Sequence, residues 1–371
     1  MLRTTHSCCN SIIRCQAQID RQENMIMQKR TLALSVASIL AATSFGALAE
    51  MPTIYGTMDL SVTDSDTGYT VVNTSNDVGT VLENNNSNIG LKGTFDLNSA
   101  LKLVYKAEFG VNGTDNDADT FSSRNTYMGL AGGFGEVVFG RNDTAFKKSE
   151  GGVDLFGNHN ADFANVMPGS DRVADGITYS LPKMGMLTGV ATYILEDDNE
   201  GATSDDGNNF AATIGYGDKK LKKANYYVGV GYVDGIKDLT AYRLIGQLKI
   251  ADLSLGAIYQ DSEKTSNTEV DAKGYLLSAK YPVGNFIVKG QFGYDDGGMG
   301  KFATQHAKTK DADGNKLPGT IDETTVWTVG ADYPLSKAAY VYGYYSNYTG
   351  DFVEGGDIND DVFTVGLNYK F

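Results

Sequence analysis

The sequence predicts an all-β fold, a 16-stranded antiparallel transmembrane β-barrel with one constriction loop folded into its interior. Three observations support this prediction. Apolar and polar residues alternate with period two in segments of about ten residues. Short connections alternate with long acidic ones along the chain. The last segment is an alternating strand that ends on an aromatic residue, Phe371.

The first 49 residues are expected to lie outside this fold. Lys29-Arg30, an apolar run and Ala47-Leu48-Ala49 form the pattern of a secretory signal peptide over residues 27–49. Residues 1–26 fit no part of that pattern, and we interpret them as an extension upstream of the true start. The barrel is then expected over residues 50–371.

This division excludes several classes of function. All three cysteines lie before residue 50, so the mature chain is expected to lack disulfides, thiolate metal sites and cysteine nucleophiles. Five of the 31 basic and two of the 46 acidic residues are removed as well, which leaves 26 and 44 and a net charge of −18. So acidic an exported chain lacks the basic face that binding to nucleic acid requires.

Sixteen alternating segments follow one another from Pro52 to Phe371, and their polar faces carry Lys, Gln, Asn and Thr, as a wet interior allows. No apolar run in this part reaches the roughly 18–20 residues of a membrane-spanning helix. The expected strand starts are Pro52, Asn86, Leu101, Arg124, Glu136, Gly176, Met186, Asn209, Ala224, Thr240, Leu253, Ala272, Phe286, Thr324, Ala339 and Asp361.

The connections between these segments are of two kinds. Short turns such as Leu97–Ala100 and Gly132–Gly135 alternate with long loops such as Asn142–Asp175, Asp261–Asp271 and Asp295–Glu323. Outer-membrane barrels have short turns on one side and long loops on the other. Because a loop as long as Asn142–Asp175 is unusual in a compact β protein, we expect it to fold inside the barrel and narrow it.

A soluble β-sandwich also alternates apolar and polar residues. The expected strands, however, approach the roughly 9–11 residues of a tilted membrane strand rather than the roughly 5–6 of soluble proteins. Aromatic residues also gather towards strand ends, where membrane barrels carry aromatic girdles. The residues expected there are Tyr281, Tyr294, Tyr333, Tyr348 and Tyr369.

Several short motifs make the chain similar to the general porins of Gram-negative bacteria. They are Ile54-Tyr55-Gly56, Ile89-Gly90-Leu91-Lys92-Gly93, Met128-Gly129-Leu130-Ala131-Gly132-Gly133-Phe134-Gly135, Phe139-Gly140-Arg141-Asn142 and Tyr369-Lys370-Phe371. The resemblance implies a homotrimer in the cell outer membrane, among lipid and lipopolysaccharide. The terminal aromatic strand resembles the signal by which such barrels are handed to the barrel assembly machinery. No cofactor and no metal are implied.

The resemblance also implies a constriction in which an acidic loop faces arginines on the barrel wall. Arg124 and Arg172 match wall arginines, and Asp154 lies where the family has a loop carboxylate. Arg141 lies at the base of the loop and is interpreted as structural, while Glu150 is a further loop carboxylate. Fixed charges in a narrow opening bias which ions pass.

The sequence departs from the family pattern on the wall. Asn88 stands where many porins have an arginine, and Thr57 stands where a basic residue is common. The usual Pro-Glu-Phe-Gly-Gly loop motif is absent, with Asp154-Leu155-Phe156-Gly157 as its nearest match. The wall is therefore expected to carry fewer arginines while the loop stays acidic, which predicts a preference for cations.

These observations predict a water-filled channel for passive diffusion of ions and small hydrophilic solutes. Catalysis is not expected, because His159 and His306 have no triad context. The run 311–315 resembles a calcium loop but lacks its final carboxylate, and we interpret it as solvated surface. Two alternatives stay open. One is a substrate-specific channel for sugars or oligosaccharides, lined by tyrosines. The other is a surface adhesin or receptor that binds through Asp295–Glu323 and Gly350–Asp360.

Overall fold

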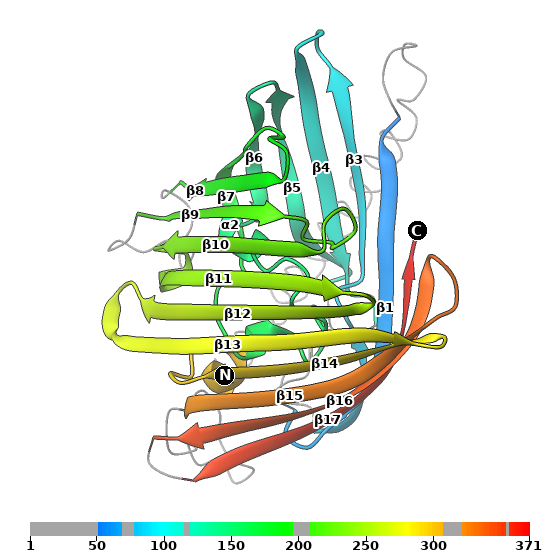
Figure 1. Cartoon of the computed structure of the whole chain (residues 1–371), viewed down its shortest axis with the longest axis vertical. Coiled ribbons are helices and arrows are strands. Elements are labelled where there is room, and N and C mark those ends of the chain that lie inside the picture. Colours follow the sequence, from blue (N-terminus) through cyan, green and yellow to red (C-terminus); the bar gives the residue numbers. More distant parts are fainter. Residues whose placement is uncertain (1–50, 69–77, 115–118, 196–207, 307–320, 354–355) are drawn as a thin grey trace, which may run out of the picture. The chain divides into compact units, whose positions relative to one another are not determined.

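A computed structural model describes residues 51–68, 78–114, 119–195, 208–306, 321–353 and 356–371. Within these ranges most residues lie in β-strands (Figure 1). The expected signal peptide, the upstream extension and the run 311–315 lie outside the described residues. None of the helices in the described part is long and apolar enough to cross a membrane.

The strands follow one another in chain order around the sheet, each antiparallel to its neighbours. They are β1 (Thr53–Ser65), β2 (Gly79–Asn84), β3 (Asn88–Asp96), β4 (Leu101–Val111), β5 (Phe121–Gly132), β6 (Gly135–Asp143), β7 (Arg172–Ser180), β8 (Leu187–Ile194), β9 (Phe210–Gly217), β10 (Tyr226–Asp234), β11 (Leu239–Ile250), β12 (Leu253–Lys264), β13 (Asn267–Val283), β14 (Phe286–Asp295), β15 (Ile321–Pro334), β16 (Ala339–Phe352) and β17 (Asp357–Lys370). The short helices are α2 (Ala145–Lys148), η2 (Phe163–Asn165), η3 (Ile236–Asp238) and α3 (Lys301–His306).

Seventeen strand segments fill the 16 positions of a closed barrel. β2 and β3 share one position, because β2 pairs with residues 60–65 of β1 and β3 pairs with residues 53–57. The chain leaves the ladder between them, where Asn86 has a φ of 59°. On its other edge β1 pairs with β17, and Leu60 lies opposite Leu367. The predicted 16-stranded antiparallel barrel is confirmed.

The period-two pattern separates an apolar outer face from a polar inner one. On β11, Leu244 is 52% exposed on the outside, whereas its neighbour Arg243 is 0% exposed on the inside. On β17, Phe363 is exposed and Thr364 is buried. Alternate side chains of a strand point to opposite faces of a sheet, so a barrel in lipid needs this arrangement.

Aromatic side chains form pairs at the rim that carries the short turns. The rings of Phe286 and Tyr333 lie 5.0 Å apart, and those of Tyr369 and Phe371 lie 5.9 Å apart. The expected girdle residues Tyr281, Tyr333 and Tyr369 are exposed.

Two expectations about individual segments were wrong. Tyr348 is 0% exposed and faces the interior, because its position on β16 has inward parity. The expected long loop Asp261–Asp271 is a tight turn, since β12 continues to Lys264 and β13 begins at Asn267. The strands remain paired there although polar residues occupy both of their faces, and Glu263 lies opposite Asp271.

The two chain ends of the barrel meet at Gly56 and Phe371. Their backbones exchange two hydrogen bonds, of 3.0 and 3.1 Å. A Cβ atom at Gly56 would lie 2.3 Å from Cζ of Phe371 and 2.8 Å from the carbonyl oxygen of Asn88, so a larger residue here would displace the terminal ring. This contact holds the last residue against the first strand.

Candidate functional site

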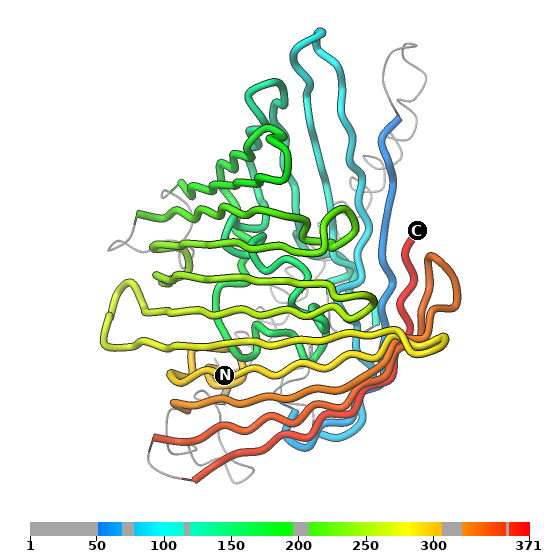
Figure 2. Tube along the Cα trace, in the orientation of Figure 1, coloured from blue at the N-terminus to red at the C-terminus, as the bar shows by residue number. Residues whose placement is uncertain are grey.

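Residues 144–171, between β6 and β7, fold into the interior of the barrel, and we call them the constriction loop. Figure 2 shows this segment in green, crossing behind strands β10 to β13. Thr144 caps α2 by accepting a hydrogen bond of 3.1 Å from the backbone N–H of Lys147. Asp162 caps η2 in the same way, at 2.8 Å from the N–H of Ala164. Thr and Asp are residue types that satisfy free N–H groups at helix starts.

Apolar side chains hold the loop against the inner wall. Phe156, Val166 and Met167 of the loop are fully buried. Val166 and Met167 belong to one apolar cluster with wall residues that include Tyr227 of β10 and Leu276 of β13. Each such burial contributes about 1.5–3 kcal/mol relative to exposure to water. The predicted inward-folded loop is confirmed.

Arg243 of β11 anchors both ends of the constriction loop. Its guanidinium donates hydrogen bonds to the carbonyl oxygens of Phe146, at 3.2 Å, and Pro168, at 3.1 Å. Nε donates to Oε1 of Gln260 at 2.7 Å. Oε1 of Glu150 lies 3.5 Å from Nη1. The fully buried cation thus has hydrogen-bond acceptors and a nearby carboxylate, as a buried charge requires.

The tip of the loop is anchored on the opposite side of the barrel. The backbone N–H of Asn160 donates to the hydroxyl of Tyr344 at 3.1 Å, and its carbonyl accepts a hydrogen bond of 2.9 Å from Tyr348. Gln291 of β14 accepts a hydrogen bond of 3.0 Å from the backbone N–H of Leu155. The loop therefore contacts strands on both sides of the lumen.

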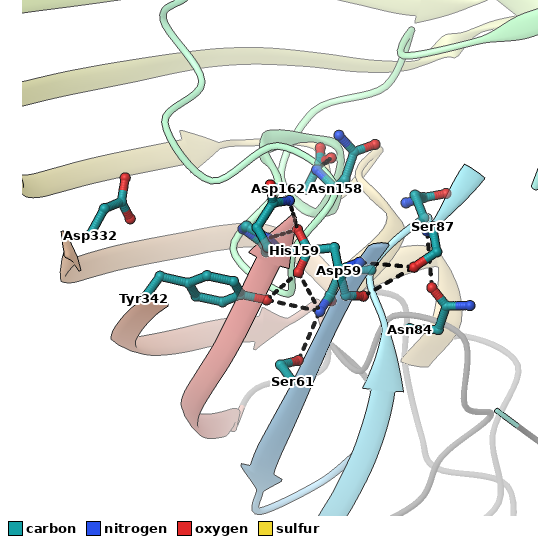
Figure 3. Close-up of polar contacts among 12 residues, drawn as sticks. Asp59, Ser61, Asn84, Ser87, Asn158, His159, Asp162, Asp332 and Tyr342 are labelled. Atoms are coloured by element: carbon teal, nitrogen blue, oxygen red, sulfur yellow. Dashed lines mark hydrogen bonds and ion pairs between the residues drawn. The ribbon is translucent and has the colours of Figure 1, made fainter. Parts of the chain in front are cut away.

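Asp59 of β1 is the centre of a further anchor (Figure 3). Its Oδ2 lies 3.1 Å from Nε2 of His159 in the loop, and its Oδ1 accepts a hydrogen bond of 2.6 Å from Tyr342. Asn368 of β17 donates to Oδ2 at 2.6 Å. The His159 ring stacks on Tyr342, with centroids 4.6 Å apart. This buried network joins the loop to the strands where the barrel closes.

The inner wall beside β4 and β5 carries paired charges. Nε of Arg124 lies 2.9 Å from Oε1 of Glu108, and Nη1 donates to Oδ1 of Asn86 at 3.3 Å. Nζ of Lys106 lies 2.9 Å from the other carboxylate oxygen of Glu108. The Glu108 carboxylate therefore forms ion pairs with both Arg124 and Lys106.

Arg172 forms a second paired site nearby. Its Nε lies 3.0 Å from Oδ1 of Asp143 and donates to Oδ1 of Asn125 at 2.8 Å. Arg124 and Arg141 lie within electrostatic range of Arg172. Arg141 sits at an irregularity of the β6–β7 ladder, and its buried Nε has no hydrogen-bond partner among the described residues.

The carboxylates of the loop lie in shielded positions. Asp154 accepts hydrogen bonds from the backbone N–H groups of Phe156, at 3.0 Å, and Phe163, at 3.4 Å. Burial, together with the neighbouring Asp162 carboxylate, raises the pKa of Asp154 to about 7. Burial raises the pKa of Glu150 to about 8, against the opposing effect of Arg243.

Comparison with known sequences decides the family. Residues 33–352 match the family described as Gram-negative porin. The chain belongs to the Gram-negative porins. This porin resides in the outer membrane, and its family and fold imply a channel rather than an enzyme.

Curated relatives of this porin come from several bacteria. It is 28% identical over 273 residues to outer membrane protein U of Vibrio vulnificus, a match that covers 72% of this chain and 68% of the relative. It is 28% identical over 375 residues to major outer membrane protein P.IB of Neisseria meningitidis, which covers 93% of this chain and 100% of the relative.

Solved structures share the barrel of this porin. An anion-selective porin from Comamonas acidovorans superposes with a TM-score of 0.64 at 20% identity, covering 86% of this chain and 99% of that one. The trimer form of OmpT from Vibrio cholerae gives a TM-score of 0.61 at 15% identity, with the same coverage. At these identities the likeness shows the fold alone.

The structure brings only some of the predicted site residues of this porin together. Arg124, Arg141 and Arg172 lie on one part of the wall, whereas Glu150 lies beside Arg243. Among the described residues, no hydrogen bond or ion pair joins Asp154 to Arg124 or Arg172. Their role in the constriction stays a prediction.

The residues that fix the loop in place were not predicted from the sequence. Asp59, His159, Arg243 and Gln291 carry these contacts. Period-two parity places the three wall residues on the inner face, because each stands next to an apolar residue of the outer face, namely Met58, Leu244 or Phe292. No sequence signal says which inward residues meet the loop.

Proposed function

We propose that this porin is a homotrimeric, water-filled channel through which ions and small hydrophilic solutes diffuse passively across the outer membrane. The observation that carries the proposal is the constriction loop, which is anchored on both sides of the lumen by Arg243, Asp59 and Gln291. A loop fixed in this way narrows the passage permanently and does not act as a gate. The trimer form of OmpT supports the trimeric state.

Sieving by size is proposed to be combined with a bias by charge. The proposed filter consists of Arg124 and Arg172 on the wall and Glu150 and Asp154 on the loop, with Arg141 at the base of the loop in a structural role. Glu108 and Asp143 lie 2.9 and 3.0 Å from Arg124 and Arg172 and offset much of the charge of these arginines. Asp154 forms no ion pair among the described residues, which leaves its charge uncompensated by a cation when it is ionised. This difference supports a modest preference for cations.

One observation bears on the sugar-specific alternative. Tyr342, Tyr344 and Tyr348 form an inward row on β16, which could have lined a path for sugars. All three are buried beneath the constriction loop, so they anchor the loop instead of presenting rings to a solute. This favours general diffusion over a sugar-specific channel.

The loops of the adhesin alternative fall partly outside the described residues. Contact with lipopolysaccharide and delivery by the barrel assembly machinery stay predictions.

Conductance of the refolded chain in a planar bilayer under a salt gradient tests the proposal. We expect large steps in groups of three and a reversal potential that favours potassium over chloride. A reversal potential that favours chloride would contradict the cation preference. Small steps that one sugar blocks would support a specific channel, and a folded barrel without conductance would support an adhesin or receptor.

Variants locate the charge filter. Replacing both Arg124 and Arg172 by Gln should shift the reversal potential further towards potassium, and Asp154→Asn should shift it towards chloride. Changing both Lys183 and Lys337 to Gln is the matched control, because these lysines lie in exposed turns, between β7 and β8 and between β15 and β16. Equal shifts in the control and in the wall variant would mean that net charge, and not the filter, sets selectivity.

A further inference from the structure

The turn between β9 and β10 differs in charge from the other turns on its side of the barrel. Residues 218–225 contain four lysines, Lys219, Lys220, Lys222 and Lys223, against the single acid Asp218. The other short turns each carry at most one lysine. Net charge in the rest of the barrel is strongly negative, so this cluster is a local exception.

The lysine turn is held rigidly by its own backbone. Asp218 accepts hydrogen bonds from the backbone N–H groups of Lys220, at 3.0 Å, Lys222, at 2.8 Å, and Lys223, at 2.6 Å. Backbone donors, that of Lys223 foremost, lower the pKa of Asp218 to about 2. Leu221 is buried between the lysines. The carboxylate of Asp218, the single acid of the turn, is therefore occupied by backbone N–H groups. Among the described residues, it does not form an ion pair with the lysine side chains of the turn.

The lysines of the turn divide into one that faces inward and three that face water. Lys219 donates a hydrogen bond of 2.6 Å to the carbonyl oxygen of Lys148 in the constriction loop. Lys220, Lys222 and Lys223 are exposed, and none of the three forms an ion pair within the described part of the chain. Three free ammonium groups within four residues repel one another unless an anion lies between them.

Neighbouring aromatic residues place the lysine turn at the membrane boundary. Tyr216, the last residue but one of β9, is 49% exposed, and Tyr226, the first residue of β10, is 39% exposed. Their rings lie 6.2 Å apart on the outside of the barrel. Tyrosines at the ends of membrane strands sit at the depth of the lipid headgroups. The lysines follow Tyr216 closely in the chain and precede Tyr226, so the girdle position of the two tyrosines implies that the lysines lie near the headgroup phosphates.

We propose that Lys220, Lys222 and Lys223 bind the headgroups of anionic phospholipids in the leaflet on the short-turn side of the barrel. Basic clusters beside a membrane segment attract anionic lipids electrostatically. The aromatic boundary favours lipid over a soluble polymer, because it holds the ammonium groups against the membrane surface. A cell-wall polymer rich in carboxylates is the competing partner.

Retention of phosphatidylglycerol by the full barrel tests this proposal. The wild-type protein is reconstituted in phosphatidylcholine nanodiscs with a minor fraction of phosphatidylglycerol, released into mild detergent, and its bound lipids are counted by native mass spectrometry. Changing Lys220, Lys222 and Lys223 together to Gln should reduce retention about tenfold or more. The same residues changed to Arg should retain the lipid. Channel conductance reports that each variant is folded.

The matched control changes Lys264, Lys273 and Lys301 to Gln, since these lysines are exposed at the long-loop end. This control should keep its phosphatidylglycerol. Equal losses in both triple variants, or no loss in either, would overturn the proposal. Unchanged lipid retention with lost binding to purified cell-wall sacculi would assign the turn to the polymer instead. For the wild-type protein, retention of phosphatidylglycerol should fall as the salt concentration is raised. Retention that does not depend on salt would also overturn the proposal.

Discussion

Arg243 fixes the path of the constriction loop by binding both of its ends. Sequence parity places it on the inner face of β11, because the exposed Leu244 follows it. Parity does not predict that its guanidinium reaches the carbonyl oxygens of Phe146 and Pro168, which lie 75 or more positions away in the sequence. Such contacts depend on where the loop crosses the lumen. The anchor was therefore outside the reach of sequence analysis.

Replacing Arg243 by Met should loosen the constriction loop. The change removes the hydrogen bonds of the guanidinium to two backbone carbonyls and leaves Oε1 of Gln260 and the carboxylate of Glu150 without their buried cation, which should cost about 3 kcal/mol in the free energy of unfolding. We expect noisier and larger single-channel currents together with a lower midpoint in urea. Lys249→Met on the same face of β11 is the control, and a similar loss there would argue against a specific anchor.

Selectivity should depend on pH through the loop carboxylates. The pKa of Asp154 is about 7 and that of Glu150 about 8, so both gain negative charge as the pH rises through this range. We expect the ratio of potassium to chloride permeability to increase from about pH 6 to about pH 9. Asp154→Asn should remove the lower part of this increase, and the exterior change Asp351→Asn should leave it intact. A constant ratio in the wild type would contradict the prediction.

The strands of the barrel could be predicted from the sequence, but the segments that fold inside the barrel could not. The period-two pattern is local, so β4, β12, β14 and β16 begin at the residues expected from the sequence. Glu263 and Asp271 lie in paired strands where the sequence predicts a loop, because polar residues on both faces hide the period-two pattern of a strand. Helix α3 lay within an expected long loop. Its packing depends on the constriction loop, which comes from another part of the chain.

Helix α3 supports the constriction loop from the long-loop side. Phe302 is fully buried, and its ring lies 5.1 Å from that of Tyr348. It belongs to the apolar cluster that contains Val166 and Met167 of the loop. A Cβ atom at Gly300 would lie 2.3 Å from the carbonyl oxygen of Val166, which shows how closely the two segments approach.

Phe302→Ala should destabilise this support. Loss of a buried ring leaves a cavity, and we expect about 3 kcal/mol less stability in urea-induced unfolding and more frequent current fluctuations. Phe134→Ala removes the same ring from an exposed turn and should change neither quantity. If both variants behave alike, α3 does not support the loop.

At the scale of the whole molecule, the barrel was predicted more completely than its interior. Strand number, antiparallel order and closure follow from repeated local patterns and from the terminal strand. The distribution of charge along the lumen depends on ion pairs such as that between Arg124 and Glu108, which lie on neighbouring strands. These pairs could be proposed only after the strand register was known.

Engineered cysteines can test the lumen in the intact barrel, because residues 50–371 contain none. Lys106 lies on the inner wall beside Glu108, whereas Met128 on the next strand is exposed on the outside. A charged, membrane-impermeant thiol reagent should reduce the current through a Lys106→Cys channel and leave that of Met128→Cys unchanged. The opposite result would mean that the water path does not pass this wall.

The anchoring of the loop tip has a consequence for the order of assembly. Asp59 of β1 holds His159 while it is itself bound by Tyr342 of β16 and Asn368 of β17. These partners come from opposite ends of the chain, so the set is complete only after the first and last strands have met. The nascent pore is therefore wide before it is narrow. The loop tip reaches its final position only after closure, so the passage beside it should be wider in an unfinished barrel than in the finished pore.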